Sequence, residues 1–236
     1  MPKKENIRTM FDAVAPDYDR LNHILSFDID KGWRKKAVKE ITDKGHAMEV
    51  LDVACGTGDF SIAIARAAAP GSHVTGLDLS EGMMKIGREK VASEGLEGIV
   101  SMEQGDCEQL GFPDCSFDRV SVAFGVRNFE HLETGLQEML RVLRPGGKAV
   151  ILELSVPENP VMRFMYKLYA LHILPAIGGM VSGNKGAYRY LPASVLKFPG
   201  PKRFLQMMES CGFKETKSKA FTFGICRMYS GTRPEK

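Results

Sequence analysis

Residues 50–59, VLDVACGTGD, join an apolar run to a loop of small residues that carries two acids. Twenty residues after Gly58, a second apolar run at 74–77 ends at another acid, Asp78. A buried strand, a glycine-containing turn and an acid at the end of the next strand are typical of a nucleoside site at the carboxyl edge of a parallel sheet. This combination predicts an α/β fold.

The spacing of the glycines argues against a dinucleotide. A dinucleotide loop reads GxGxxG, because the pyrophosphate must approach bare backbone. Here Gly56 and Gly58 are followed by Ser61 where the third glycine would stand, and Asp59 places a carboxylate where the pyrophosphate would lie. A carboxylate attracts a sulfonium or an ammonium group, so the loop favours S-adenosylmethionine, with Asp78 holding the ribose hydroxyls. The alternatives are a simple strand-to-helix turn for the glycines and a helix N-cap for Asp78.

The hydrophobic pattern alternates between strand-like and helix-like segments. Strands are predicted at 48–53, 73–77, 99–104, 117–123 and 147–154, and helices at 59–69, 80–93 and 132–143. Helices are also predicted within 6–45 and near 200–211, and a closing hairpin at about 213–220 and 222–231. Leu143–Gly147 is expected to form a turn, because Pro145 cannot continue a helix.

This alternation predicts a parallel sheet with helices on both faces. We expect one domain over residues 1–236, with an N-terminal helical segment at 1–45 and an inserted apolar cap at about 157–199. The segment 161–181 is rich in aromatic residues and methionine and has few charges. That composition favours an isoprenoid tail or a membrane as its partner over simple core packing.

Composition argues against several other classes of protein. A chain of 236 residues that is 44% hydrophobic can bury a large core, and its net charge of +3 is too small to imply a nucleic-acid partner. The five cysteines show no metal-ligand spacing, so free thiols and no metal are expected. No signal peptide or membrane span is recognised, so a cytoplasmic protein is expected, with peripheral membrane contact and a homodimer left open.

Short motifs are spread along nearly the whole chain. They are FDxxAxxYDxxN from Phe11 with Trp33-Arg34, the loop 51–59, FGVRN at 124–128, YLPxS at 190–194 with Phe198-Pro199, and the closing TxG at 222–224 and YxG at 229–231. Together they resemble the menaquinone/ubiquinone biosynthesis C-methyltransferases, and FGVRN and YLPxS are the most specific of them. The resemblance implies a class I methyltransferase (Rossmann-like) fold, whose seven-stranded sheet includes an antiparallel strand in its last pair.

The resemblance also implies an activity, in which a methyl group passes from S-adenosylmethionine to a ring carbon of a prenylated quinol. Demethylmenaquinol is the favoured substrate, and a methoxy-benzoquinol of ubiquinone biosynthesis is the alternative. A non-catalytic S-adenosylmethionine-binding module and a nicotinamide-dependent reductase are the rival hypotheses. By position, the family's cofactor residues fall on Thr57, Asp78 and the turn at 105–107. Two positions depart from relatives: Ala123 stands where some have serine, and Cys107 where many have alanine.

Predicted cofactor residues cluster at the ends of the first three strands: Asp52, Gly56, Thr57, Gly58, Asp78, Asp106 and Cys107. Asp106 is expected to accept a hydrogen bond from the adenine amino group, with an Asx-turn as the alternative. Asp52 is expected to orient the loop, or to face the cofactor's ammonium group. Asp59 is either a helix cap or an electrostatic partner of the cofactor.

Predicted catalytic residues follow the fourth strand. Arg127, with Asn128, is expected to hold a developing quinol oxyanion, and its alternative is a salt bridge to Glu130 or Glu153. Candidates for closing over the cofactor or the ring are Tyr18, Tyr188 and Tyr190, for which packing is the alternative. His131 is considered as a general base, although a histidine at a helix start is more often an exposed bystander.

Overall fold

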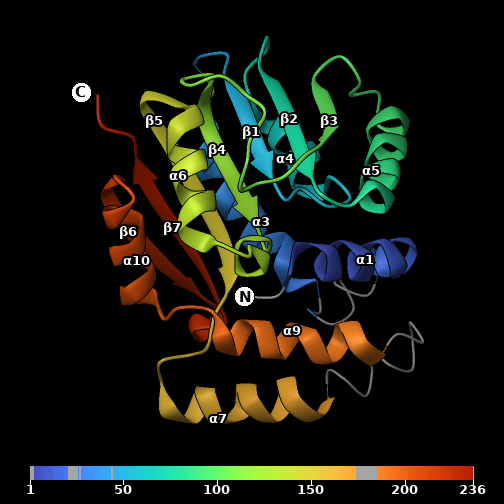
Figure 1. The fold of residues 1–236 in the computed structure, drawn as a ribbon, viewed down its shortest axis with the longest axis vertical. Coiled ribbons are helices and arrows are strands. Elements are labelled where there is room, and N and C mark those ends of the chain that lie inside the picture. The colour runs from blue at the N-terminus through green and yellow to red at the C-terminus, as the bar shows by residue number, and fades with distance from the viewer. Residues whose placement is uncertain (1–2, 21–25, 27, 44, 174–184, 236) are drawn as a thin grey trace.

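The computed structural model describes residues 3–20, 26, 28–43, 45–173 and 185–235, and places seven strands in one sheet. The strands are β1 (Glu49–Val53), β2 (His73–Asp78), β3 (Val100–Gln104), β4 (Phe117–Ala123), β5 (Leu143–Leu154), β6 (Lys214–Phe221) and β7 (Cys226–Thr232). Their order is β3-β2-β1-β4-β5-β7-β6 (Figure 1). Strands β1 to β5 are parallel, and β7 is antiparallel to both β5 and β6. The predicted class I fold is confirmed.

Helices pack on both faces because side chains along each strand alternate in direction. In β5, Ala149 and Ile151 belong to the core shared with the buried residues of α6 (Leu132–Val142) and α10 (Pro201–Ser210). Val150 and Leu152 belong to the core shared with α3 (Ile29–Ile41) and α4 (Asp59–Ala67). Helix α5 (Glu81–Ser93) packs against β3, next to the edge of the sheet.

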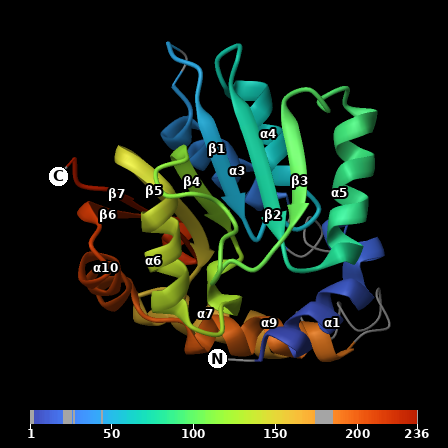
Figure 2. The same ribbon diagram turned by 45° about the horizontal axis from the view of Figure 1, so that its top comes forward.

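A further layer crosses the end of the sheet at which the parallel strands terminate (Figures 1 and 2). It contains α1 (Lys4–Val14), η1 (Ala15–Asp17), η2 (Val126–Asn128), α7 (Pro160–Leu168), the π-helix η3 (Tyr169–Ile173), α9 (Lys185–Lys197) and η4 (Thr222–Gly224). Residues 21–25 and 174–184, which fall in the predicted N-terminal and cap segments, lie outside the described residues. This layer forms the walls of the cavities described below.

Two predicted boundaries are wrong for reasons of backbone geometry. The turn expected at Leu143–Gly147 lies inside β5, where the pairing with β4 jumps from Leu143 to Lys148 and leaves the intervening residues as a bulge. The last strand begins at Cys226 instead of 222, because Thr222 and Phe223 have positive φ of 45° and 56° and form η4. An extended strand cannot contain residues in that conformation.

Candidate functional site

The loop after β1 turns sharply toward α4. Gly56 and Gly58 have positive φ of 58° and 79°, which glycine adopts readily. Ala54 also has a positive φ, 53°, which is uncommon for a residue with a Cβ atom. A Cβ atom at Gly56 would meet no other atom within 4 Å, so the backbone there borders open space.

Asp78 joins this loop to the end of β2. Its Oδ2 accepts a hydrogen bond from the Gly56 N–H at 2.8 Å, and its Oδ1 accepts one from the Ser80 N–H at 2.9 Å. Burial raises the pKa of the Asp78 carboxyl, although these backbone donors oppose the rise. The N-cap of α5 is Ser80, whose Oγ accepts from Met83 N–H, so the alternative role of Asp78 as the cap is wrong.

The side chain of Asp52, on β1, is enclosed by the protein. It is fully buried, and its two oxygens accept hydrogen bonds from Ser61 Oγ at 2.6 Å and Ser121 Oγ at 2.8 Å. Ser61 therefore anchors the start of α4 to β1, which is a reason for serine where a dinucleotide loop has its third glycine. Of the two roles expected for Asp52, the geometry supports orientation of the loop.

The buried Asp52 carboxyl makes stability depend on pH. Burial raises its pKa to about 6, whereas the unfolded value is about 3.9. Between these values the folded state holds a proton that the unfolded state has released, so the free energy of unfolding falls as the pH rises toward 6. Between pH ~4.5 and ~7.5 we expect the ionisation of Asp52 to lower the free energy of unfolding by about 2 kcal/mol. Urea denaturation of wild type and Asp52→Asn at both values tests this, since an equal pH dependence in both proteins would contradict it.

The acids and hydroxyls nearest α4 have partners elsewhere in the protein. Thr57 Oγ1 donates to Asp19 at 2.6 Å, and Lys90 pairs with both Asp19 and Asp59. Arg34 also pairs with Asp59, at 3.2 Å. Of the two roles expected for Asp59, that of a helix cap is wrong, because the N-cap of α4 is Gly58. Its role as an electrostatic partner of the cofactor stays a prediction, with two cations of the protein beside it.

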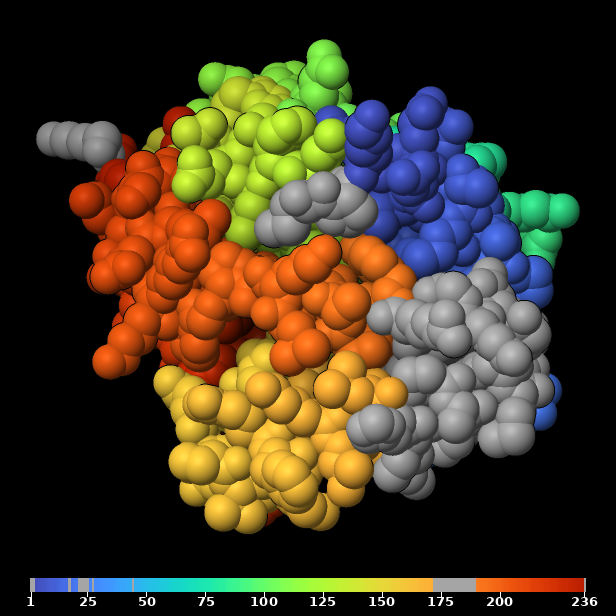
Figure 3. Space-filling view, turned by 60° about the horizontal axis from the view of Figure 1, so that its bottom comes forward, coloured from blue at the N-terminus to red at the C-terminus, as the bar shows by residue number. Residues whose placement is uncertain are grey.

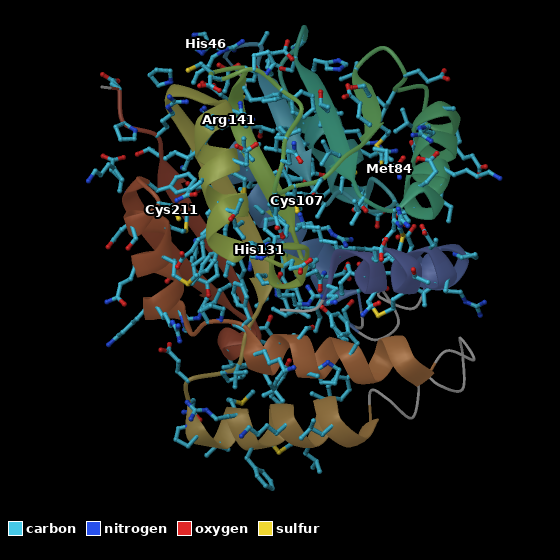
Figure 4. The ribbon with its side chains drawn as sticks, viewed as in Figure 1. His46, Met84, Cys107, His131, Arg141 and Cys211 are labelled. Atoms are coloured by element: carbon cyan, nitrogen blue, oxygen red, sulfur yellow. The ribbon has the colours of Figure 1, made fainter. Side chains whose placement is uncertain are left out.

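A first cavity lies between α1 and the ends of β1, β2 and β4. Of the predicted cofactor residues, it is lined by Gly56, Asp78, Asp106 and Cys107, and not by Asp52, Thr57 or Gly58. Apolar side chains complete it: Leu77, Leu79, Met83 and Phe129. Figure 4 shows Cys107 near α1, with His46 at the opposite end of the sheet. Carboxylates beside an apolar slot suit the ribose and the flat adenine of S-adenosylmethionine, so the residues present fit this cofactor.

Helix α1 closes over the first cavity through Lys4, which the sequence did not single out. Lys4 Nζ pairs with Asp106 at 2.7 Å and with Glu108 at 3.1 Å. Asp106 also accepts from Glu108 N–H at 2.8 Å, which is the Asx-turn considered as its alternative role. With α1 in this position the cavity measures about 80 Å³, which is smaller than the volume that a ligand of nucleoside size requires.

A second, larger cavity of about 390 Å³ lies beneath α7 and α9. Its walls are mainly aromatic and apolar: Trp33, Phe124, Met162, Met165, Tyr166, Tyr169 and Leu191. Tyr18 and Phe124 line both cavities, so the two adjoin at these side chains. Within η2, Arg127 lines the second cavity and Asn128 lines the first. The FGVRN segment thus contributes to both.

Arg127 is held by the protein. Its guanidinium pairs with Glu153 at 2.7 Å, and also donates to the Phe124 carbonyl and to Ser194 Oγ at 3.3 Å. The alternative role as a salt bridge to Glu153 is therefore observed, while Glu130 accepts from the Lys4 N–H. Ser194 belongs to the YLPxS motif, which was the available sequence signal for this contact.

The remaining predicted side chains are those of Tyr190, Tyr188 and His131. Tyr190 Oη donates to Asn128 Oδ1 at 2.8 Å, which connects α9 to η2. The side chain of Tyr188 lies outside the described residues. His131 lines neither cavity, and its Nδ1 pairs with Glu108 at 2.9 Å while most of the ring is exposed. Its exposure fits the alternative of a bystander at a helix start, and a role as general base stays untested.

Comparison with known proteins assigns the chain to a family. The model of the ubiE/COQ5 methyltransferase family matches residues 1–233. The chain belongs to this family. It is 48% identical over 231 residues to the ubiquinone/menaquinone biosynthesis C-methyltransferase UbiE of Geobacter sulfurreducens, a match covering 98% of this chain and 90% of that protein. It is 43% identical to the demethylmenaquinone methyltransferase of Bacteroides fragilis, covering 98% and 94%.

Solved structures show the same fold at low identity. A SAM-dependent methyltransferase from Thermotoga maritima superposes with a TM-score of 0.69 at 17% identity, and the match covers 97% of this chain and 99% of that one. At this identity the likeness concerns the fold alone. The predicted family and fold class are both confirmed.

Asp78→Ala is expected to weaken the binding of S-adenosylmethionine by about 1–3 kcal/mol, the cost of losing a charge-assisted hydrogen bond. The change also leaves the N–H groups of Gly56 and Ser80 without their acceptor. Isothermal titration calorimetry measures the affinity. Glu103→Ala, at an exposed position on neighbouring β3, is the matched control. Unchanged affinity in Asp78→Ala would remove Asp78 from the cofactor site.

Proposed function

We propose that this protein transfers the methyl group of S-adenosylmethionine to a ring carbon of a prenylated quinol, with demethylmenaquinol as the substrate. The observation that carries the proposal is the pair of cavities that adjoin at Tyr18 and Phe124. One has the carboxylates and apolar slot of a nucleoside site, and the other is large, apolar and aromatic, as a quinol ring with a hydrocarbon tail requires. The names of the relatives from Geobacter sulfurreducens and Bacteroides fragilis support quinone-ring methylation.

The chemistry divides between the ligands and the protein. Bound S-adenosylmethionine supplies an electrophilic methyl group on its sulfonium. Tyr18 and Phe124 fix where the two ligands meet, which sets the contact between the reacting atoms. Arg127 presents a cation to the second cavity, where it favours a quinol oxygen that has lost its proton. Loss of that proton to water makes the ring carbon more nucleophilic. After the carbon has gained the methyl group, its own ring proton also passes to water, which restores the aromatic ring.

Methyl transfer from labelled S-adenosylmethionine to short-chain demethylnaphthoquinol, followed by mass spectrometry of the extracted lipid, tests this function. A methoxy-benzoquinol with the same tail, assayed in parallel, distinguishes the two ring systems. Label in the naphthoquinol is the expected result. Tight cofactor binding without label in either lipid would support the non-catalytic binding module. Tighter binding of NADH than of S-adenosylmethionine in calorimetry would support the reductase.

We also propose that the outer face of α7 docks on a lipid bilayer. Val161, Phe164 and Leu168 lie on this helix with 70%, 68% and 45% of their surface exposed. Figure 3 shows α7 on the surface beside α9. Met165 is 54% exposed and also lines the second cavity, so the apolar surface is continuous with the proposed substrate site. Described residues form no helix long and apolar enough to cross a membrane.

Docking on a bilayer fits the chemistry of the second cavity and of the outer face of α7. A prenylated quinol resides in the bilayer, and a cavity that opens onto an apolar helix face lets the ring enter while the tail stays in lipid. Arg163 and Lys167 are exposed on α7 and can contact anionic headgroups. Flotation with phosphatidylglycerol vesicles is expected to recover wild type and Ile99→Ser but not Phe164→Glu. Equal flotation of all three proteins would contradict the proposal. If size-exclusion chromatography showed a dimer for wild type and Ile99→Ser but not for Phe164→Glu, the outer face of α7 would be a homodimer interface instead.

A further inference from the structure

Arg34 lies on α3, beside the second cavity. Its Nη1 donates to Asp30 at 3.0 Å and to Asp59 at 3.2 Å. Its guanidinium carbon lies 5.4 Å from the centre of the Phe124 ring, the ring shared by both cavities. Arg34 also lines the second cavity, as Asp30 does. A second guanidinium therefore accompanies Arg127 there.

One donor of Arg34 has no acceptor. Among the described residues, three buried side-chain atoms lack a hydrogen-bond partner: Arg34 Nε, Arg227 Nε and Tyr229 Oη. Of these three residues, only Arg34 lines either cavity. A buried N–H of a charged group without an acceptor is costly. Nε itself is shielded from solvent, so a ligand oxygen in the second cavity removes this cost where the wall beside Nε shifts to admit it. The two carboxylates hold Nη1, so the guanidinium is fixed in place with Nε unpaired.

We propose that Arg34 is a second substrate-binding residue, whose Nε–H donates to a ring oxygen of the quinol. This assignment rests on the proposed function, because a quinol carries two oxygens at opposite positions of the ring. Arg127 contacts Phe124 through its backbone carbonyl, whereas Arg34 lies over the Phe124 ring. The two guanidinium groups therefore contact different parts of Phe124, and both residues line the second cavity. Each binds one quinol oxygen, and together they fix which ring carbon faces the cofactor.

The single tryptophan of the chain provides a binding assay independent of turnover. Trp33 lines the second cavity, and a naphthoquinol bound there is expected to quench its fluorescence. The probe is 1,4-naphthoquinol with a short prenyl tail, titrated under anaerobic conditions. Arg34→Lys keeps a cation for Asp30 and Asp59 but has no donor at the Nε position. We expect its Kd for the quinol to rise about tenfold, which equals about 1.4 kcal/mol, with the affinity for S-adenosylmethionine unchanged.

Asp59→Asn is the matched control, because it weakens the same ion pair and leaves Nε in place. Its quinol affinity is expected to stay near that of wild type. The assignment is overturned if Arg34→Lys binds the quinol as tightly as wild type, or if Asp59→Asn weakens binding equally, which would make Arg34 only a structural partner of Asp59. A wild type that shows neither quenching nor methyl transfer would overturn the proposed function, and this assignment with it.

Discussion

Arg127→Met is expected to lower turnover and to destabilise the fold at the same time. The Arg127 guanidinium is 5% exposed and lies 2.7 Å from the fully buried Glu153 carboxylate. Methionine would leave that carboxylate without its cation, and breaking a buried ion pair from one side costs about 3–5 kcal/mol. Because Arg127 also lines the second cavity, we expect kcat to fall by about 100- to 1000-fold, as when a stabilising donor is removed from a transition state.

A double variant separates the two effects. In Arg127→Met with Glu153→Gln, the uncompensated charge disappears. The backbone N–H groups of residue 127 and Leu154 now bond different oxygens of Glu153, so the single amide oxygen can keep only one of these two bonds. We expect urea denaturation to show that most of the lost stability returns, with about 1–3 kcal/mol still missing because one backbone N–H has no acceptor. Turnover is expected to stay lost, with cofactor affinity near normal by calorimetry. If turnover returned with stability, Arg127 would be a structural partner of Glu153 and no more.

The elements of the sheet could be predicted because each depends on a local hydrophobic pattern. The predicted strands at 48–53, 73–77 and 117–123 differ from β1, β2 and β4 by at most one residue at either end. The predicted boundaries are wrong where the backbone conformation, and not the hydrophobic pattern, ends a strand. In η4, for example, Thr222 and Phe223 have positive φ. Threonine and phenylalanine do not usually adopt that conformation. The hydrophobic pattern therefore predicted a strand from residue 222, although β7 begins at Cys226.

The partners of the site residues could not be predicted in the same way. Lys90 pairs with Asp59 across 31 residues of sequence, and Asp19 accepts from Thr57 across 38. These contacts depend on how α5 and the N-terminal segment pack against α4, which no single segment encodes. The inference of S-adenosylmethionine depended on Ser61 and on the carboxylate of Asp59. The family confirms the cofactor, but the sequence did not reveal that Lys90 and Arg34 pair with this carboxylate.

Sequence motifs located the site better than they assigned roles within it. FGVRN supplies Phe124, Arg127 and Asn128, all of which line a cavity. The motif does not reveal that Arg127 pairs with Glu153, because the ion pair forms only when the ends of β4 and β5 lie side by side. Trp33-Arg34 was recognised as a motif without any role, and only the unpaired Arg34 Nε beside the second cavity suggests one.

Gly125→Ala is expected to damage both cavities, because the structure has no space for the added methyl group. A Cβ atom at Gly125 would lie 2.6 Å from the Cβ atom of Ala54. Ala54 and Phe124 already have positive φ, 53° and 61°, at the ends of β1 and β4, so further displacement there is costly. We expect a loss of about 1–3 kcal/mol in stability. A shift of Phe124, which lines both cavities, is expected to lower kcat/KM about 100-fold.

The reciprocal change at Ala54 tests this cause directly. In Gly125→Ala with Ala54→Gly, the methyl group moves from one strand end to the other, and glycine accepts the positive φ without strain. We expect thermal denaturation and kcat/KM to recover most of the loss. Gly111→Ala is the control, since its Cβ atom would meet nothing within 4 Å, and it is expected to change stability by less than ~1 kcal/mol. If the double variant were no better than Gly125→Ala, the contact with Ala54 would not be the constraint that positions Phe124 between the two cavities.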